Sequence, residues 1–145
     1  MIKVFIQNES ESNQKHLHNE KRLEQQRTVT VSRPYPYPYG FILDTTSDDG
    51  DNLDCFVITK QPLKTGMSVE CDPVALLEQV EDGQEDHNIL TVLSGKNQEI
   101  SQDVISTIRD FIAHVFDHVP GKQISTGRLL PQEAAEVYIA TCLDT

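Results

Sequence analysis

The sequence predicts a single, mainly β domain of the α+β class that spans residues 1–145. Two observations support this. Short apolar runs rich in β-branched residues follow one another from the N-terminus, separated by Pro, Gly or acidic clusters. Two amphipathic segments of helical period come after them. Because no repeat or change in composition marks a second domain, we expect one core built on a small barrel or sandwich.

The N-terminal part begins with a short strand over residues 2–6. Residues 7–27 are polar and highly charged, so we expect a long loop or a weak hairpin there. Residues 28–32 alternate Thr and Val, which predicts a strand. The segment 33–40 contains Pro at every second position from 34 to 38, and because proline lacks a backbone donor we expect it to be extended and irregular.

The middle of the chain contains further short runs that we interpret as strands, over residues 53–59, 67–71, 74–80 and 89–93. A helix is then expected over residues 102–118. Ser101 is its candidate N-cap, and its core face carries Val104, Ile108, Phe111 and Val115. A second helix is expected from Pro131, with Ala134, Val137, Tyr138 and Cys142 on its packed side.

The charge and hydropathy of the chain exclude several classes of function. The net charge of −11 argues against nucleic-acid binding, because that affinity comes chiefly from neutralised phosphates. No apolar run is long enough to span a membrane, and the apolar opening is too short for a signal peptide, so we expect a cytoplasmic location. The three cysteines form no CxxC pair, so we interpret them as reduced and mostly buried thiols.

Two acidic clusters are the candidate functional elements. In the first, Asp49, Asp51 and Asp54 lie along a glycine-containing turn that leads into an apolar strand. The second comprises Glu78, Glu81, Asp82, Glu85 and Asp86, between two expected strands. Carboxylates this close repel one another unless they are exposed to water or neutralised by a hard cation such as Mg²⁺, Mn²⁺ or Ca²⁺. A metal site where both connections meet at one barrel end is one interpretation, and solvated acidic loops are the other.

The Tyr-Pro segment and the first acidic cluster together resemble a known family. The order Tyr35-Pro-Tyr-Pro-Tyr39-Gly40, followed by an Asp-Gly-Asp turn ending at Asp54, is similar to the motif of the family I soluble inorganic pyrophosphatases. The resemblance continues through residues 73–77, 83–90 and 108–122 and is weak before Arg27. It implies the inorganic pyrophosphatase fold, a five-stranded OB-like barrel with two helices.

The same resemblance implies hydrolysis of pyrophosphate to two phosphates by a metal-bridging hydroxide, with Mg²⁺ as cofactor and Mn²⁺ as an alternative. It suggests Asp49, Asp54 and Asp86 as metal ligands, and Glu81 falls where the family has an Asp ligand. Asp51 resembles the base that activates water. Three residues are suggested for substrate binding: Arg27 resembles a phosphate contact, Tyr39 matches a tyrosine that hydrogen-bonds product phosphate, and Tyr35 matches a second tyrosine that lines the site. Packing at the barrel mouth is the alternative role for both tyrosines.

Several family positions are substituted, which leaves two functions open. On an ungapped alignment a family Glu falls on Val4, a Lys and a Glu fall on Asn13 and Lys15, and a substrate-site Lys falls on Asn88. A family Tyr-Lys pair falls on Val119 and Pro120. Lost cations weaken transition-state stabilisation, although Lys15, Lys21, Arg22 or Lys122 could compensate. The protein is therefore expected to be either an active pyrophosphatase or a pseudoenzyme that binds metal or a partner, and in both cases a homo-oligomer.

Overall fold

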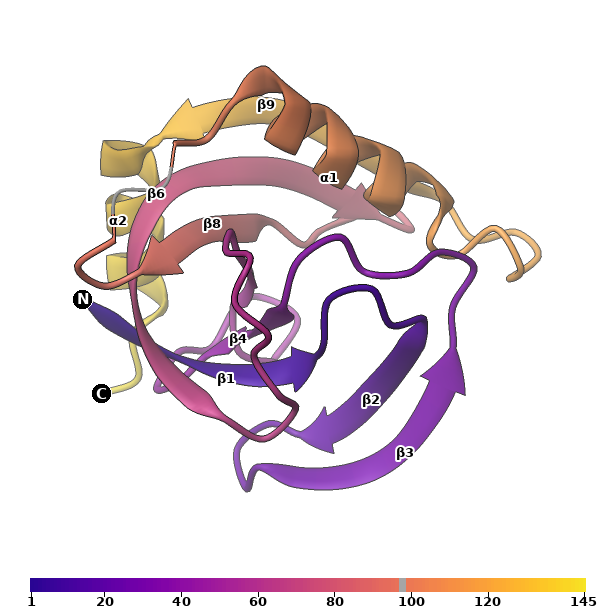
Figure 1. The fold of residues 1–145 in the computed structure, drawn as a ribbon, viewed down its shortest axis with the longest axis horizontal. Coiled ribbons are helices and arrows are strands. Elements are labelled where there is room, and N and C mark those ends of the chain that lie inside the picture. The colour runs from indigo at the N-terminus through magenta and orange to yellow at the C-terminus, as the bar shows by residue number, and fades with distance from the viewer. Residues whose placement is uncertain (97–98) are drawn as a thin grey trace.

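A computed structural model describes residues 1–96 and 99–145 and contains a closed five-stranded barrel (Figure 1). The strands pair in the order β1, β4, β5, β8, β6, and β6 pairs back to β1. Their bounds are β1 (Ile2–Asn8), β4 (Tyr39–Ile42), β5 (Asp54–Val57), β6 (Ser68–Glu81) and β8 (Asn88–Leu93). The predicted mainly β barrel with two helices is therefore confirmed.

Strand β6 is longer than the sequence predicts. Residues 67–71 and 74–80 were expected to form two strands, but they belong to a single strand of 14 residues that curves along the barrel. The prediction was wrong because Pro73 does not interrupt the strand. It lies at a register shift between Pro73 and Ala75, where the ladder tolerates a residue that lacks an N–H donor. Strands β7 (Gln84–Glu85) and β9 (Ile124–Pro131) also pair with β6, and β9 was not predicted.

The polar segment after β1 forms a hairpin, the second of the two alternatives expected for it. Strands β2 (Gln14–Asn19) and β3 (Glu24–Thr30) pair antiparallel, with Leu17 opposite Arg27. The strand predicted over residues 28–32 therefore begins and ends earlier. The proline-rich segment that follows is irregular as expected, but β4 already begins at Tyr39, a strand that the sequence analysis missed.

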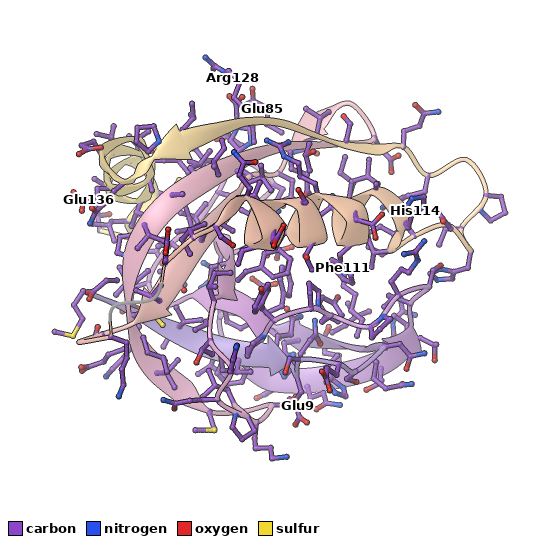
Figure 2. The ribbon with its side chains drawn as sticks, turned by 45° about the horizontal axis from the view of Figure 1, so that its top comes forward. Glu9, Glu85, Phe111, His114, Arg128 and Glu136 are labelled. Carbon is purple, nitrogen blue, oxygen red and sulfur yellow. The ribbon has the colours of Figure 1, made fainter. Side chains whose placement is uncertain are left out.

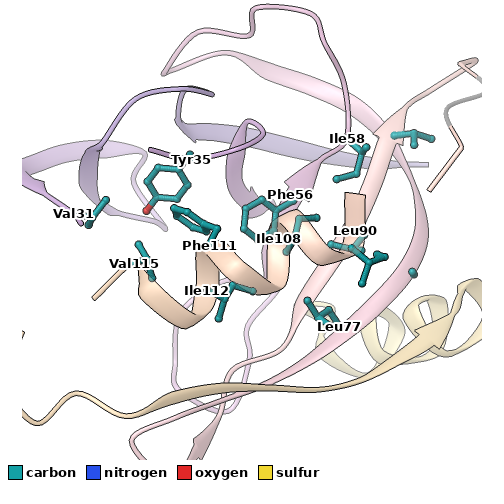
Figure 3. Close-up of a cluster of buried hydrophobic side chains, with 13 residues drawn as sticks. Val31, Tyr35, Phe56, Ile58, Leu77, Leu90, Ile108, Phe111, Ile112 and Val115 are labelled. Carbon is teal, nitrogen blue, oxygen red and sulfur yellow. The ribbon is translucent and has the colours of Figure 1, made fainter. Parts of the chain in front are cut away.

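Helix α1 (Gln102–His114) has the predicted cap and core face. The Ser101 Oγ accepts a hydrogen bond from the Val104 N–H, and the buried face carries Ile105, Ile108, Phe111 and Ile112. The helix ends four residues before the predicted end, because residues 115–118 form turns. Phe111 points from α1 toward the barrel (Figure 2), where it packs between Tyr35 and Phe56 (Figure 3). This contact connects the helix to the Tyr-Pro segment and to β5.

Helix α2 (Gln132–Cys142) packs against β6 with a face that agrees only in part with the predicted one, since Tyr138 and Cys142 are partly buried against the same core cluster. Its buried residues are Ala135 and Ile139, whereas Val137 is 65% exposed. The prediction was wrong for Val137 and missed Ala135 and Ile139, because both faces of this helix carry apolar residues and periodicity alone does not select the packed side. Pro131, expected as the first helical residue, is instead the N-cap and the last residue of β9.

The alternating side chains of β5 divide the core into two clusters. Phe56 and the α1 face belong to one cluster, and Cys55, Val57 and the α2 face belong to the other. Cys55 and Cys71 are buried free thiols and Cys142 is a partly exposed one, as predicted. Among the described residues, no helix has the length and hydropathy needed to cross a membrane.

Candidate active site

The two acidic clusters meet in one pocket of about 200 Å³. Six carboxylates line it, from the β2–β3 turn, the β4–β5 connection, the start of β5, the end of β6 and the approach to β8: Glu20, Asp49, Asp51, Asp54, Glu81 and Asp86. The expected meeting of both acidic connections is therefore observed. Glu78 of the second cluster lies elsewhere, because its carboxylate is paired with the guanidinium of Arg128.

The Asp-Gly-Asp turn is held in shape by its own hydrogen bonds. Asp49 Oδ1 accepts hydrogen bonds from the Ser47 hydroxyl and from the Asp51 N–H, the latter at 2.9 Å. Gly50 has a φ of +88°, a left-handed conformation that glycine adopts without steric cost. Asp49 therefore uses one oxygen to fix the turn, which leaves its other oxygen available to a ligand in the pocket.

Asp54 and Asp86 form an interacting pair of carboxyl groups in the pocket. Asp54 is the first residue of β5, and Asp86 is positioned by its N–H, which donates to the Gln79 carbonyl at 3.0 Å. Burial raises the pKa of Asp54 well above its ordinary value, and the charges of Asp86 and Glu20 raise it further. Burial also raises the pKa of Asp86. Of the two carboxyl groups, Asp54 is therefore the one that keeps its proton to higher pH when no cation is bound.

Glu20 is a sixth pocket carboxylate that the sequence analysis did not identify. Its Oε1 accepts the Asn52 N–H at 3.0 Å, which connects the β2–β3 turn to the acidic turn. Burial raises the pKa of Glu20 to about 7, with a further contribution from the negative charge of Asp51. Nothing in the sequence distinguishes Glu20 from its charged neighbours, because only the hairpin geometry brings it over the pocket.

The hairpin also contributes a cation to the pocket. Lys15 lines it together with Leu17, and the positive charge of Lys15 lowers the pKa values of both Asp54 and Asp86, although other influences outweigh this. Arg27 is exposed and does not line the pocket. As the register partner of Leu17, it lies on the same face of the hairpin as that pocket residue.

Both predicted tyrosines line the pocket and also pack in the core. Their rings are 5.4 Å apart, and the Tyr35 ring lies 4.6 Å from that of Phe111. Burial raises the pKa of each hydroxyl, and for Tyr39 the charges of Asp54 and Asp86 add to the effect. The hydroxyl of each tyrosine therefore stays protonated and can donate a hydrogen bond. Each ring both lines the pocket and packs at the mouth of the barrel.

The substituted family positions have different surroundings. Val4 is fully buried in the α2 cluster, and neither it nor Asn13 lines the pocket, whereas Gln7 and Lys15 do. Of the three N-terminal positions that the ungapped alignment indicates, only Lys15 therefore lines the pocket. Asn88 lines the pocket and donates to Gln79 Oε1, and its own Oδ1 is buried without a partner.

Of the cations considered as replacements, Lys15 and Lys122 are close to the pocket carboxylates, and the charge of Lys21 also lowers the pKa of Glu20 and Asp51. Lys122 Nζ lies 3.6 Å from Glu81 Oε2. Lys21 Nζ donates instead to the Thr45 carbonyl at 2.7 Å and to the Thr46 hydroxyl at 2.8 Å, so it supports the acidic turn from outside. Arg22 is exposed and does not line the pocket.

The donor set suits a hard divalent cation. Oxygen ligands select Mg²⁺, Mn²⁺ or Ca²⁺, and a cation would take the place of the proton shared by Asp54 and Asp86. In the described part of the chain, no three His, Cys, Asp or Glu side chains are already arranged to hold a metal ion. Binding therefore requires the carboxylates to turn toward the ion.

A comparison with protein-family models identifies the chain. The model described as inorganic pyrophosphatase matches residues 3–145. The chain belongs to the inorganic pyrophosphatase family. The resemblance that begins with the Tyr-Pro segment and the Asp-Gly-Asp turn is thereby confirmed over nearly the whole length of the chain.

Individual members of the family support this assignment. An inorganic pyrophosphatase of Nanoarchaeum equitans is 31% identical over an alignment that covers 95% of this chain and 92% of that protein. One from Wigglesworthia glossinidia brevipalpis is 33% identical, but the match covers 54% of this chain and 48% of the relative. The crystal structure of an inorganic pyrophosphatase from Neisseria gonorrhoeae superposes on this chain with a TM-score of 0.89 and 26% sequence identity. The match covers 97% of this chain and 87% of the Neisseria chain.

Proposed function

We propose that this protein hydrolyses inorganic pyrophosphate to two phosphates with Mg²⁺ as its cofactor, Mn²⁺ being able to replace it. The observation that carries this proposal is the convergence of six carboxylates and Lys15 in one pocket of a pyrophosphatase barrel. Pyrophosphate is a polyanion, so carboxylates tolerate it only when cations lie between them. A site of this composition is therefore suited to a metal complex of a phosphoanhydride.

We assign the metal-holding role to Asp49, Asp54, Glu81 and Asp86. Bound Mg²⁺ would neutralise phosphate oxygens and lower the pKa of a water molecule from about 15.7 toward 7. Asp49 is pre-oriented by the Ser47 hydroxyl and the Asp51 N–H. Asp54 begins β5, and Asp86 lies just before β8, the strand that pairs with β5. Glu81 is the last residue of β6. The barrel thus supports ligands that lie far apart in sequence.

Asp51 is the proposed base that accepts a proton from the attacking water. Its side chain lines the pocket, and its N–H is held by Asp49. Burial and the charge of Asp49 raise the pKa of Asp51 above its ordinary value, which makes the carboxylate a better proton acceptor. It is therefore suited to the role that the family motif suggests.

Neutral and positive groups are proposed to bind the phosphate oxygens. The hydroxyls of Tyr35 and Tyr39 remain protonated and can donate hydrogen bonds. Arg27 lies on the Leu17 face of the hairpin and can approach from the rim, and Lys15 already lines the pocket. These groups offset part of the charge lost where Asn88 occupies a family lysine position.

One observation favours a second candidate function, a pseudoenzyme that binds a metal ion without turnover. Asn88 and its partner Gln79 form a neutral amide pair where the resemblance places a lysine. A neutral amide stabilises phosphate charge in a transition state less than an ammonium group does. The two candidates share the metal site and differ in whether phosphate is released.

Phosphate release from magnesium pyrophosphate near pH 7.5 tests the proposal, with Asp51→Asn as the matched variant. Active wild type and a rate reduced about 10²- to 10⁴-fold in the variant would support hydrolysis by this site. Equal rates in both proteins would show that the activity does not come from this pocket. No release by the wild type, together with Mn²⁺ binding by calorimetry, would support the pseudoenzyme instead.

We also propose that the protein is a cytoplasmic homo-oligomer. The family resemblance implies an assembly that involves the first helix, and the exposed side of α1 is available for such contacts. Sedimentation equilibrium at micromolar concentration tests this, and a monomer mass of 16.4 kDa at all concentrations would contradict it.

A further inference from the structure

Lys122, in the connection between α1 and β9, contacts two carboxylates at the edge of the pocket. Its Nζ lies 3.6 Å from Glu81 Oε2 and 3.4 Å from Asp82 Oδ2. It also lies 4.9 Å from the centroid of the Phe116 ring, which lines the pocket. The side chain is 24% exposed, so its charge is partly removed from water. The Lys122 ammonium group is therefore held beside the pocket by Glu81, Asp82 and Phe116.

The backbone on either side of Lys122 fixes this position. The Asp82 N–H donates to the Gln123 carbonyl at 2.7 Å, and the Gln123 N–H donates to Asp82 Oδ1 at 2.8 Å. Glu81 and Ile124 are register partners where β6 meets β9. The backbone next to Lys122 is thus hydrogen-bonded to the end of β6 that carries Glu81. The Lys122 side chain is flexible and can contact different partners.

A second ammonium group lies on the same aromatic ring. Lys15 Nζ is 4.8 Å from the Phe116 centroid, and Lys15 comes from β2, on a different part of the molecule. Two cations near one ring repel each other, and an anion between them relieves this repulsion. Two ammonium groups, those of Lys15 and Lys122, therefore lie 4.8 Å and 4.9 Å from the centroid of one pocket-lining ring, and a phosphate group that contacts both would offset their repulsion.

Glu81 now has two possible partners, Lys122 and the metal ion that it is proposed to bind. A carboxylate that turns to a divalent cation loses much of its attraction for an ammonium group. We propose that Lys122 is a substrate-binding residue that Glu81 holds in the metal-free protein and releases to a substrate phosphate once a metal ion engages Glu81. This inference rests on the proposed function, since it assumes a metal complex of pyrophosphate as the ligand.

The proposal requires that loss of the Lys122 charge has opposite effects on the two ligands. Lys122→Met keeps an unbranched side chain over Phe116 but removes the positive charge. Glu81 then loses a competing cation, so Mn²⁺ alone should bind about twofold to fivefold more tightly. Methylenediphosphonate, a pyrophosphate analogue that is not hydrolysed, should bind about tenfold more weakly in the presence of Mg²⁺, because a charged hydrogen bond is lost.

Arg128→Met is the matched control. Arg128 pairs with Glu78 across the same two strands, β6 and β9, and projects outward away from the pocket (Figure 2). The control removes the same charge from β9 itself, close to Lys122 in the chain, so a general effect of net charge would appear in both variants. Lys122→Arg serves as the conservative variant and should recover most of the affinity for the diphosphonate.

Isothermal titration calorimetry of the wild type and these variants decides the matter, after thermal unfolding has verified that each is folded. Tighter Mn²⁺ binding and weaker diphosphonate binding in Lys122→Met, with Arg128→Met unchanged in both, would support the proposal. Any other combination overturns it, as does a wild type that binds no diphosphonate. Because neither ligand is hydrolysed, the result is independent of turnover, and a protein that releases no phosphate could still confirm this role of Lys122.

Discussion

The carboxyl groups of Asp54 and Asp86 interact directly inside the pocket, although both belong to a residue type that is ordinarily ionised at neutral pH. Burial and mutual repulsion raise the pKa of Asp54, and a shared proton relieves the repulsion. A divalent cation can replace this proton. Metal binding and proton release are therefore expected to be coupled at this pair.

We expect the affinity for Mn²⁺ to rise as the pH rises through the raised pKa of Asp54, and binding to release protons. Calorimetry at pH 6.5 in two buffers of different ionisation enthalpy measures the number of protons released. Asp54→Asn keeps the shape of the side chain but has no proton to lose, so it should bind Mn²⁺ more weakly and release fewer protons. Identical heats in both buffers for the wild type would contradict the shared proton.

Glu20 should make the stability of the metal-free protein depend on pH. Its pKa is raised from 4.5 to about 7 on folding, so the folded state binds this proton more tightly than the unfolded state does. The free energy of unfolding therefore falls as pH rises from about 4.5 to about 7. Glu20→Gln keeps an oxygen for the Asn52 N–H and removes the charge, so we expect it to stabilise the protein at pH 8 by about 1 kcal/mol.

Thermal unfolding in EDTA at pH 4.5 and pH 8 tests this expectation. The melting temperature of Glu20→Gln should exceed that of the wild type by about 3 °C at pH 8 and by little at pH 4.5. Glu24→Gln, an exposed neighbour on β3, is the control and should change neither value. A Glu20→Gln protein less stable than the wild type at both pH values would show that the carboxylate stabilises the fold.

The sequence predicted the parts of the fold that depend on local pattern. The cap at Ser101 and the spacing of Ile108 and Phe111 define α1, and the apolar runs define β1, β5 and β8. Strand β9 was missed because most of its residues are exposed, so it lacks an apolar alternation, and its pairing with β6 is a long-range contact. Periodicity does not report such pairing.

The candidate site was predictable where its residues belong to one continuous motif. Asp49, Asp51 and Asp54 fall within six residues, and the expected meeting with Glu81 and Asp86 is observed. Glu20 was not identified, and Lys15 and Lys122 were only two of four candidate cations, because the hairpin and the α1–β9 connection have no distinctive spacing. Their proximity to the pocket results from tertiary structure, which an ungapped alignment does not follow.

Phe111 should matter for both stability and substrate binding. Its ring packs against Tyr35 at 4.6 Å and Phe56 at 6.1 Å, and it also lines the pocket. Phe111→Ala leaves a cavity and should cost about 3–5 kcal/mol of unfolding free energy in urea titrations, while Phe111→Leu should cost much less. If the ring positions Tyr35, Phe111→Leu should also raise KM for pyrophosphate. An unchanged KM in a folded Phe111→Leu protein would limit Phe111 to a packing role.

The packed face of α2 can be verified with two substitutions on the same helix. Ile139 is 5% exposed and Val137 is 65% exposed. Ile139→Ala should lower the free energy of unfolding by about 2–4 kcal/mol, because it removes buried apolar volume beside Ala135. Val137→Ala should change it by less than about 0.5 kcal/mol. A large loss from Val137→Ala would instead show that this face is covered by a partner, such as a second copy of the chain.

Gly40 should be among the least replaceable residues of the barrel, although its backbone conformation is an ordinary one. It follows Tyr39 in β4, and a Cβ at this position would overlap the carbonyl oxygen of Phe5 in the neighbouring strand β1. The atoms nearest this Cβ are backbone atoms of Phe5 and Gln7 in β1, which cannot move aside as a side chain can. Gly40→Ala should therefore separate β1 from β4 and lower the free energy of unfolding by more than about 3 kcal/mol. It should also displace the Tyr39 hydroxyl from the pocket.

Gly127→Ala provides the comparison, because the atoms nearest its new Cβ belong to the Glu78 side chain, at 3.1 Å and 3.2 Å. That side chain can move, so we expect a cost of about 1 kcal/mol or less in urea unfolding. If Gly40→Ala were as stable as Gly127→Ala, β1 and β4 could separate without loss of the barrel. The close approach of β1 and β4 would then not be needed to hold Tyr39 beside Asp54. The position of Tyr39 in the pocket would instead depend on the Tyr-Pro segment and α1.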